Sequence, residues 1–103
     1  MNDKKCHVDI TLDVIGGKWK LVILWHIAQK TLRFSELEKR IPGITQKMLS
    51  QQLKDMEKDK LISRKAYAVI PPRVEYSITE HGNSLKKVLK ELSSWGELHQ
   101  KTI

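Results

Sequence analysis

One segment, residues 43–79, constrains the fold more than any other, because a helical pattern passes directly into two strand-like runs. Apolar residues within residues 45–59 recur every three or four positions, which predicts an amphipathic helix. Residues 61–69 and 73–78 are rich in β-branched and aromatic residues and predict two strands. The pair Pro71-Pro72 cannot lie inside a central strand and so marks the tip of a hairpin.

A shorter helix is expected just before this segment. Ser35 and Glu38 have the spacing of a capping box, in which each side chain bonds to the other residue's backbone amide. A helix over residues 36–40 would follow and end before Pro42. The hydroxyl of Thr45 suits the N-cap of the next helix. Two helices joined by a tight turn and followed by a hairpin predict a winged helix-turn-helix, an α+β and mostly helical fold with a two-stranded wing.

Helices are also expected on both sides of this unit, within a single domain over residues 1–103. Residues 9–15 should form one that ends at two glycines, and residues 18–29, apolar on nearly all sides, should form the central core helix. Residues 79–100 predict one long terminal helix with an apolar stripe. A chain of this size cannot easily bury that stripe alone, so we expect terminal dimerisation helices that pack against a second copy. The alternative is that the helix folds back on its own domain.

Composition limits the classes of function. The net charge of +7 over 103 residues favours a polyanionic partner such as nucleic acid, although solubility alone could account for it. The longest apolar run, residues 21–25, is too short to span a membrane, and no signal peptide is recognisable. The single cysteine, Cys6, fits a reducing, cytoplasmic setting. The histidines lack metal-ligand spacing, and no nucleophile–base pattern is present. We therefore expect no metal, no cofactor and no enzymatic activity.

Polar side chains gather on the side of the 45–59 helix opposite its apolar residues. Lysine pairs well with guanine and glutamine with adenine in the major groove. We expect at least two of Gln46, Lys47, Ser50 and Gln51 to contact base edges, with Lys54 more suited to phosphate. The competing interpretation is a solvated side or phosphate contacts only. The full set of candidate DNA-binding residues is Thr45, Gln46, Lys47, Ser50, Gln51, Lys54, Lys65, Arg73 and Arg33.

The last three of these residues lie outside the helix. Lys65 and Arg73 flank the expected tip of the wing and are candidates for contact with the DNA backbone or minor groove. Arg33 precedes the helix-turn-helix and is a further phosphate candidate. A structural role for Arg73, in which it pairs with Glu75 or the wing backbone, stays open.

Cys6 is the one candidate chemical sensor. It lies just before the first predicted helix, beside His7 and close to Lys4 and Lys5. Positive neighbours and a helix N-terminus stabilise a thiolate, which oxidants, electrophiles or a second thiol can modify. The alternative is a quiet, partly buried thiol.

The order of these motifs resembles the HxlR-type winged-helix regulators, a branch close to the MarR regulators. The resemblance extends from Cys6 to Trp95, and its motifs are Cys6 with Leu12-Asp13-Val14-Ile15-Gly16-Gly17-Lys18-Trp19, Phe34-Ser35-Glu36-Leu37, Pro42-Gly43-Ile44-Thr45, Leu49-Ser50-Gln51-Gln52-Leu53 and Pro71-Pro72-Arg73-Val74-Glu75-Tyr76-Ser77-Ile78-Thr79. Two positions depart from the family's pattern: His7 stands where members commonly have proline, and Lys60 where many have glycine. A left-handed Lys60 would cost up to about 1 kcal/mol.

The resemblance implies a homodimeric bacterial or archaeal transcription factor that binds pseudo-palindromic, double-stranded operators and usually represses. It implies a recognition helix at residues 45–59, a wing at 62–78 and a dimerisation helix at 79–100. Several members sense oxidants or quinone-like electrophiles at the position of Cys6. Two alternatives stay open: a small-molecule-responsive regulator with an inert Cys6, and a winged-helix protein-interaction module without sequence-specific DNA binding.

Overall fold

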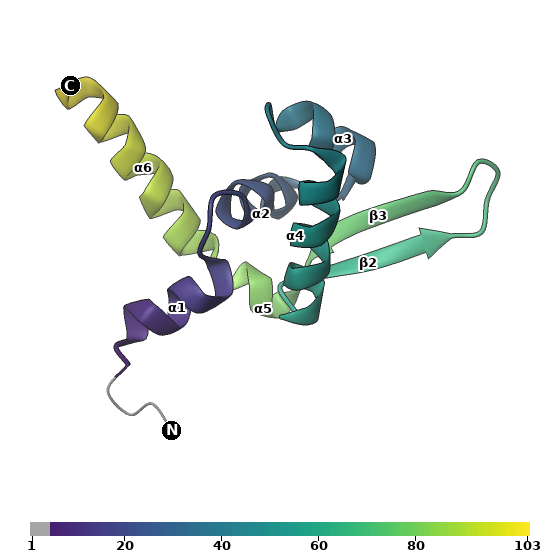
Figure 1. Cartoon of the computed structure of the whole chain (residues 1–103), viewed down its shortest axis with the longest axis horizontal. Coiled ribbons are helices and arrows are strands. Elements are labelled where there is room, and N and C mark those ends of the chain that lie inside the picture. The colour runs from purple at the N-terminus through teal and green to yellow at the C-terminus, as the bar shows by residue number, and fades with distance from the viewer. Residues whose placement is uncertain (1–4) are drawn as a thin grey trace.

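A computed structural model describes residues 5–103, so that Lys4 lies outside the described part. Its elements in chain order are α1 (His7–Ile15), α2 (Lys20–Gln29), β1 (Leu32–Arg33), α3 (Phe34–Arg40), α4 (Gln46–Lys58), β2 (Ile62–Tyr67), β3 (Arg73–Ile78), α5 (Glu80–Asn83) and α6 (Lys86–Thr102). Figure 1 shows the β2–β3 hairpin and α6 projecting from opposite sides of the molecule. This arrangement confirms the expected α+β, mostly helical fold with a two-stranded wing.

A small antiparallel sheet of order β1-β3-β2 forms the base of the wing. Ile62 lies opposite Ile78, and Arg64 lies opposite Tyr76. Since side chains alternate across a strand, these two pairs share one face of the sheet. The next pair toward the wing tip, Lys65 with Glu75, lies on the other face, which we call the outer face of the sheet.

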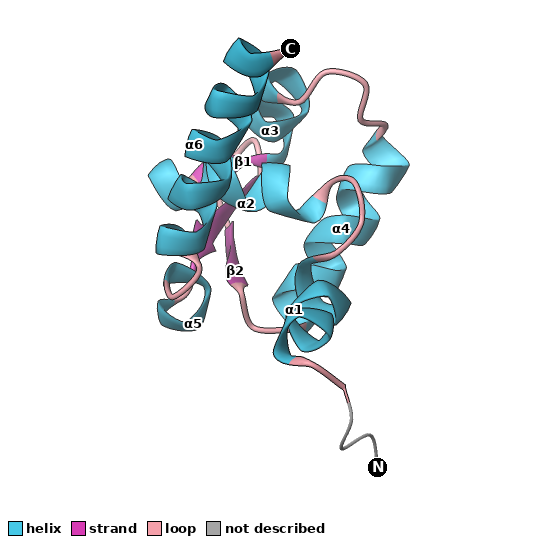
Figure 2. Ribbon diagram, turned by 90° about the vertical axis from the view of Figure 1, so that its left-hand side faces the viewer, coloured by secondary structure: helices cyan, strands magenta, loops and turns pink. Residues whose placement is uncertain are grey.

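The hydrophobic core lies where α2, α3 and α4 meet the base of this sheet. Figure 2 shows α2 between α6 and α4, as expected for a central helix. The apolar stripe predicted for α4 is buried, as are the central positions of α2. The fully buried side chains are Ile23, Leu24, Ile27, Leu32, Leu37, Leu49, Leu53, Met56, Leu61 and Ile62. This packing holds α4 rigidly by one side and leaves its other side free.

The prediction of a capping box formed by Ser35 and Glu38 at the start of α3 is wrong. The helix begins two residues earlier than predicted, at Phe34, directly after β1. Its capping carboxylate is Glu36, whose Oε1 accepts a hydrogen bond from the backbone amide of Arg33 at 2.8 Å. The pairing of β1 with β3 ends the extended strand at Arg33 and so sets where the helix can begin. In α4, by contrast, Thr45 is the N-cap as predicted, and its Oγ1 accepts from the Met48 amide at 3.1 Å.

The expected single terminal helix over residues 79–100 is also wrong, because the chain divides it into α5 and α6. Thr79 caps α5 by accepting from the Gly82 amide at 2.9 Å, and its hydroxyl also lies 2.6 Å from the carbonyl oxygen of Lys60. Gly82 packs so closely that an added Cβ would collide with the carbonyl oxygen of Leu61. This contact ties α5 to the turn that follows α4, and a separate α6 then begins beside α2 and projects away from it (Figure 1).

Lys60 has a left-handed backbone, with φ of 63°. It follows the end of α4, where the Leu61 amide donates to the carbonyl of Met56 at 2.9 Å and so closes the helix. The turn needs a residue at positive φ, which is why a glycine would suit it better. Lys60 is therefore left-handed, which is the condition under which a cost relative to glycine is predicted.

Candidate nucleic-acid interface

The exposed side of α4 carries most of the candidate residues. Gln46, Lys47, Gln51 and Lys54 are exposed, and Ser50 is partly buried, while the opposite side of the helix is in the core. The structure therefore brings these five side chains together on one rigid element. Within the described residues, the only side-chain hydrogen bond they make is from Gln51 Nε2 to Asp55 Oδ1, at 3.1 Å. Their donors and acceptors thus remain available to another molecule.

The wing candidates form a separate group on the outer face of the sheet. Lys65 Nζ lies 5.1 Å from the centroid of the Tyr67 ring, and the guanidinium carbon of Arg73 lies 4.4 Å from the same centroid. Arg73 Nε also lies 3.6 Å from Glu75 Oε2, so that the structural pairing left open as the alternative for Arg73 is present. These contacts stack two cations on one aromatic ring.

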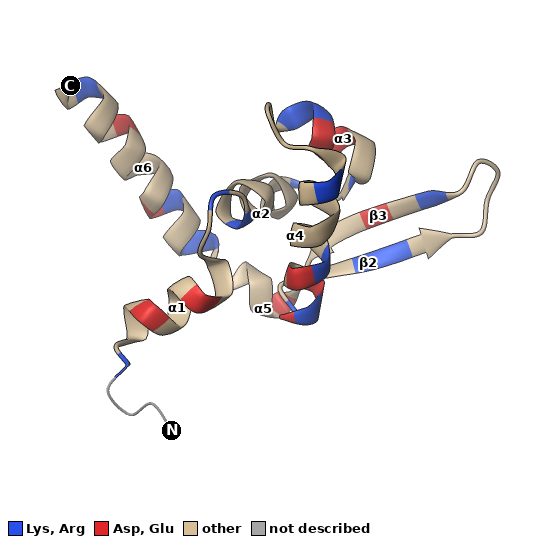
Figure 3. Cartoon of the chain, in the orientation of Figure 1, with Lys and Arg blue, Asp and Glu red and all other residues tan. Residues whose placement is uncertain are grey.

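Arg33 belongs to this outer group as well, because β1 places it opposite Glu75, as β2 places Lys65. The register therefore places three basic residues beside Glu75 on the side of the sheet that faces away from α4, and Arg73 is the one that pairs with its carboxylate. The structure does not bring Lys65, Arg73 and Arg33 together with the α4 residues. Figure 3 shows basic residues on α3, α4 and both strands of the hairpin.

A residue absent from the sequence-based set lies between the two groups. Arg64 is on the face of β2 that looks toward α4, and it lines a cleft of about 390 Å³ together with Ser50, Leu53, Lys54, Glu57 and Tyr76. A signal for it was present in the sequence. Ile62 is apolar enough to mark the buried face of the strand, and the residue two positions later must share that face.

Two titratable groups near the helix-turn-helix have displaced pKa values. The hydrogen bond from the Arg33 amide lowers the pKa of Glu36, and Lys30, Arg33 and Arg40 add to that effect. Partial burial lowers the pKa of His26, and the charge of Arg40 lowers it further. The first shift keeps the cap of α3 anionic, and the second favours an uncharged His26.

Cys6 is exposed at the N-cap of α1. Its Sγ donates a hydrogen bond to Asp9 Oδ2 at 3.2 Å. Lys5, one of the positive neighbours noted in the sequence, is paired with Asp13 instead. The thiol hydrogen is therefore engaged with a carboxylate, while the sulfur remains open to solvent.

Two further observations concern other classes of site. Within residues 5–103, no three side chains of the His, Cys, Asp and Glu types are grouped so that they could hold a metal ion. No helix in the same range combines the length and apolar character needed to cross a membrane.

Known proteins match this chain along nearly its whole length. The family described as HxlR-like helix-turn-helix matches residues 14–103. The chain is 50% identical to the uncharacterized HTH-type transcriptional regulator YkvN of Bacillus subtilis (strain 168) over 96 residues, which are 93% of this chain and 81% of that protein. It is 45% identical to an uncharacterized HTH-type transcriptional regulator of the archaeon Methanothermobacter thermautotrophicus over 94 residues, 91% of this chain and 72% of that protein.

The solved structures give the same answer for the fold. The redox regulator HypR in its reduced form has a TM-score of 0.89 and 41% identity, with 94% of this chain and 96% of that chain covered. In its oxidized form HypR has a TM-score of 0.86 and 44% identity, with 89% and 95% covered. These relatives are transcriptional regulators, and no catalytic family is indicated. The chain therefore belongs to the HxlR-like helix-turn-helix family and is a DNA-binding transcriptional regulator of the winged helix-turn-helix type.

Proposed function

We propose that the chain acts as a homodimeric repressor that binds a pseudo-palindromic, double-stranded operator. The observation that carries the proposal is the free polar side of α4, which lies opposite a fully buried stripe. We assign base contacts to Gln46, Lys47, Ser50 and Gln51, because lysine and glutamine match the major-groove edges of guanine and adenine. Thr45 begins the helix and Lys54 lies further along it, so both are assigned to the backbone.

The wing is assigned to the DNA backbone beside this groove. Lys65 and Arg73 lie on the strands of the hairpin and Arg33 on β1, and all three carry positive charge on the outer face of the sheet. Stacking on Tyr67 would hold the first two side chains extended along the wing. Contacts of this kind position the protein without reading sequence.

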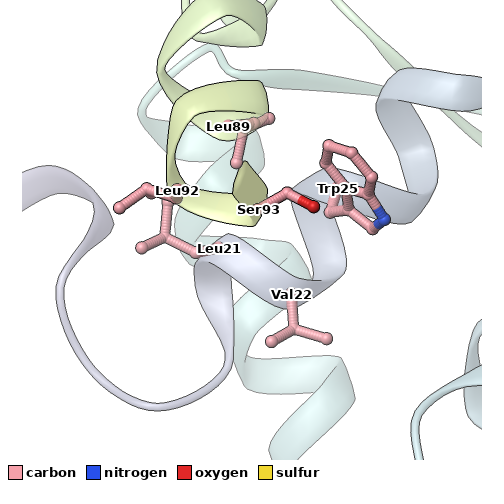
Figure 4. A pocket seen from close by; sticks show the side chains of 6 residues that line it. All are labelled: Leu21, Val22, Trp25, Leu89, Leu92 and Ser93. Carbon is pink, nitrogen blue, oxygen red and sulfur yellow. The ribbon is translucent and has the colours of Figure 1, made fainter. Parts of the chain in front are cut away.

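The homodimer is proposed from apolar surface that the single chain leaves uncovered. On α6, Leu89 is the one buried residue, whereas Trp95 is 62% and Leu98 60% exposed. Beside it, a groove of about 340 Å³ between α2 and α6 is lined by Leu21, Val22, Trp25, Leu89, Leu92 and Ser93 (Figure 4). The apolar residues Val8, Ile10 and Leu12 of α1 are exposed as well. A two-fold dimer through these helices would bury this surface and present two α4 helices to grooves about 34–36 Å apart.

Regulation is proposed to act through Cys6. An exposed thiol at the start of a helix that belongs to the dimer surface can respond to an oxidant or electrophile and change how the two subunits pack. The similarity to HypR, a redox regulator, supports this assignment. The two competing functions are a regulator that binds a small molecule and has an inert Cys6, and a protein-interaction module.

The test is fluorescence anisotropy of the reduced protein against fragments of its own upstream DNA, with excess random DNA as competitor. Tight binding that resists the competitor supports the regulator, and a steep loss of affinity with salt is expected because several phosphates are contacted. Binding no better than to random DNA contradicts the proposal and favours the interaction module.

The proposed regulation through Cys6 is tested by a separate comparison. The wild type and Cys6→Ser are compared before and after treatment with diamide or a quinone. We expect only the wild type to lose operator binding. An equal response of both proteins, or no response of either, would contradict a switch at Cys6 and favour regulation by a bound small molecule.

A further inference from the structure

The cleft between α4 and the wing includes Ser50 and Lys54, but the assignments above give no role to Arg64, Glu57 or Tyr76 of its lining. One wall is α4, which contributes Ser50, Lys54 and Glu57, and the other is the sheet, which contributes Arg64 and Tyr76. The cleft holds about 390 Å³, and its lining is more polar than that of the groove beside α6. In Figure 1 the hairpin diverges from α4, so that the space between the two elements widens toward the wing tip.

Strand register directs Arg64 into this cleft. Arg64 lies opposite Tyr76, and the next pair toward the core is Ile62 with Ile78. Ile62 and Tyr76 are buried. Because alternate residues of a strand share a face, Arg64 must point to the same side of the sheet as these buried neighbours, which is the side that α4 covers.

The charges in the cleft lack partners. Within residues 5–103, no hydrogen bond or ion pair joins the charged groups of Lys54, Glu57 or Arg64 to another side chain. On the outer face, by contrast, Arg73 contacts both Glu75 and the Tyr67 ring. Two cations and a half-buried hydroxyl, that of Ser50, are therefore available in one concave site.

The shape of DNA determines what would lie between these walls. A major groove and the minor groove next to it are separated by one sugar–phosphate strand. If α4 enters a major groove while the wing follows the adjacent minor groove, that strand must pass between α4 and the hairpin. It is this space that Lys54 and Arg64 line from opposite sides.

We propose that the cleft is a seat for one phosphate of the DNA backbone, bound by Arg64 from the wing and by Lys54 from α4. The inference rests on the proposed DNA-binding function of α4 and adds a site to it. A guanidinium offers two parallel N–H groups to a phosphate, and an ammonium offers a point charge. Because one phosphate would bridge α4 and the wing, it would set the angle between them and with it the register of α4 in the groove.

Glu57 lines the same cleft and opposes an anion there. Its negative charge offsets the positive charge of either Lys54 or Arg64. Both cations are therefore needed to give the cleft a net positive charge. Glu57→Gln should therefore strengthen binding to any DNA sequence, operator and random alike. Arg64→Lys should keep part of the affinity, because the charge remains while the paired N–H groups are lost.

The experiment uses the full chain and a duplex from its own upstream region in which one phosphate at a time is replaced by an uncharged methylphosphonate. Affinity is measured by anisotropy for the wild type, Arg64→Ala and Lys54→Ala. We expect one phosphate in each half-site whose replacement weakens the wild type about tenfold but leaves Arg64→Ala unchanged. The slope of log K against log salt should fall by about 1 in each variant.

The control is Lys90→Ala, which removes one positive charge from exposed α6, away from the cleft. It should keep the phosphate pattern and the salt slope of the wild type. Thermal melting shows whether each variant is folded. If Arg64→Ala is unstable, Lys54→Ala is used in its place. If the wild type prefers its upstream duplex but every replacement costs Arg64→Ala and Lys54→Ala as much as the wild type, the phosphate seat is refuted. If the wild type shows no preference for that duplex, the proposed function itself fails.

Discussion

At the scale of single residues, Lys60 shows how a local conformation can oppose residue type. Its φ of 63° is imposed by the hydrogen bonds that close α4 before β2 begins. A side chain with a Cβ is strained there, and only the gain from helix termination and core packing on both sides offsets the strain. Lys60 also adds a positive charge near the end of α4, which glycine would lack.

Replacing this residue gives a direct prediction. Lys60→Gly should stabilise the fold by up to about 1 kcal/mol, because glycine adopts the left-handed conformation without a Cβ clash. Urea unfolding followed by circular dichroism measures the change. Lys58→Gly is the matched control: it lies in the last turn of α4 and should cost roughly 0.5–1 kcal/mol. Destabilisation by both substitutions would show that the turn does not strain Lys60.

Glu36 gives a pH-dependent prediction at the same scale. Its pKa is lowered in the folded state, mainly by the amide of Arg33, so its stabilising effect is present at neutral pH and lost as the pH falls through the folded pKa. Urea stability of the wild type and Glu36→Gln should therefore differ most near neutral pH and converge in acid. A difference that stayed constant from pH 7 to pH 3 would contradict this role. Glu38→Gln, at the position where a cap was expected from sequence, serves as the comparison.

At the scale of elements, one side of α4 packs in the core and stabilises the fold, while the opposite side is the one that we assign to DNA recognition. Leu49, Leu53 and Met56 hold it in the core, while the polar residues that we assign to DNA make few contacts within the chain. Substitutions on the polar side should therefore change binding without changing the fold. The wing divides in the same way, because Arg64 faces α4 and Lys65 faces outward.

This separation gives a prediction for specificity. Lys47→Ala combined with Gln51→Ala should remove the preference for the operator over random DNA, while the protein keeps its helical content and its weak affinity for any duplex. The measurement is competition anisotropy together with circular dichroism. Retained preference would show that these two side chains do not read bases. Lys86→Ala with Gln100→Ala, on α6, removes the same residue types elsewhere and should leave the preference intact.

At the scale of the whole molecule, most of the uncovered apolar surface lies away from the residues that we assign to DNA. Most of the exposed apolar side chains lie on α1 and α6, although Val69 and Ile70 at the tip of the wing are exposed too. The hairpin projects from the side opposite α6 (Figure 1). Such an arrangement suits a two-fold assembly with the subunit contact on one side and DNA on the other. The proposed dimer would also account for α6, of which Leu89 is the one buried residue in the single chain.

The assembly can be tested at Trp95. Trp95→Glu should convert the proposed dimer to a monomer, because it places a charge in apolar surface that is 62% exposed in the single chain. Sedimentation at several concentrations measures the oligomeric state, and operator affinity should fall together with dimerisation. The monomer should keep its helices, since the core does not need this side chain. A dimer whose stability does not change would show that the subunit contact lies elsewhere. Lys87 is an exposed residue of the same helix, and Lys87→Glu is the control for the change in charge.

Much of the helix-turn-helix could be predicted because its signals are local. The apolar period of α4, the Thr45 cap and the two strands of the wing depend on residues a few positions apart, and each agrees with the structure. The same holds for the exposed side of α4, which follows from knowing the buried side. The start of α3 was misplaced because Arg33 is held by pairing with Glu75, forty-two residues away in sequence.

Local patterns were enough to predict the helix-turn-helix with its wing, the family and the set of polar residues on α4, since helical and strand periods are set by neighbours along the chain. They could not show where the terminal helix breaks, which cations belong to the outer face of the sheet, or that Arg64 shares a cleft with Lys54. These outcomes depend on contacts between segments distant in sequence, such as Gly82 against Leu61 and Arg73 over Tyr67. Such contacts arise when packing brings the elements together, and no local pattern encodes them.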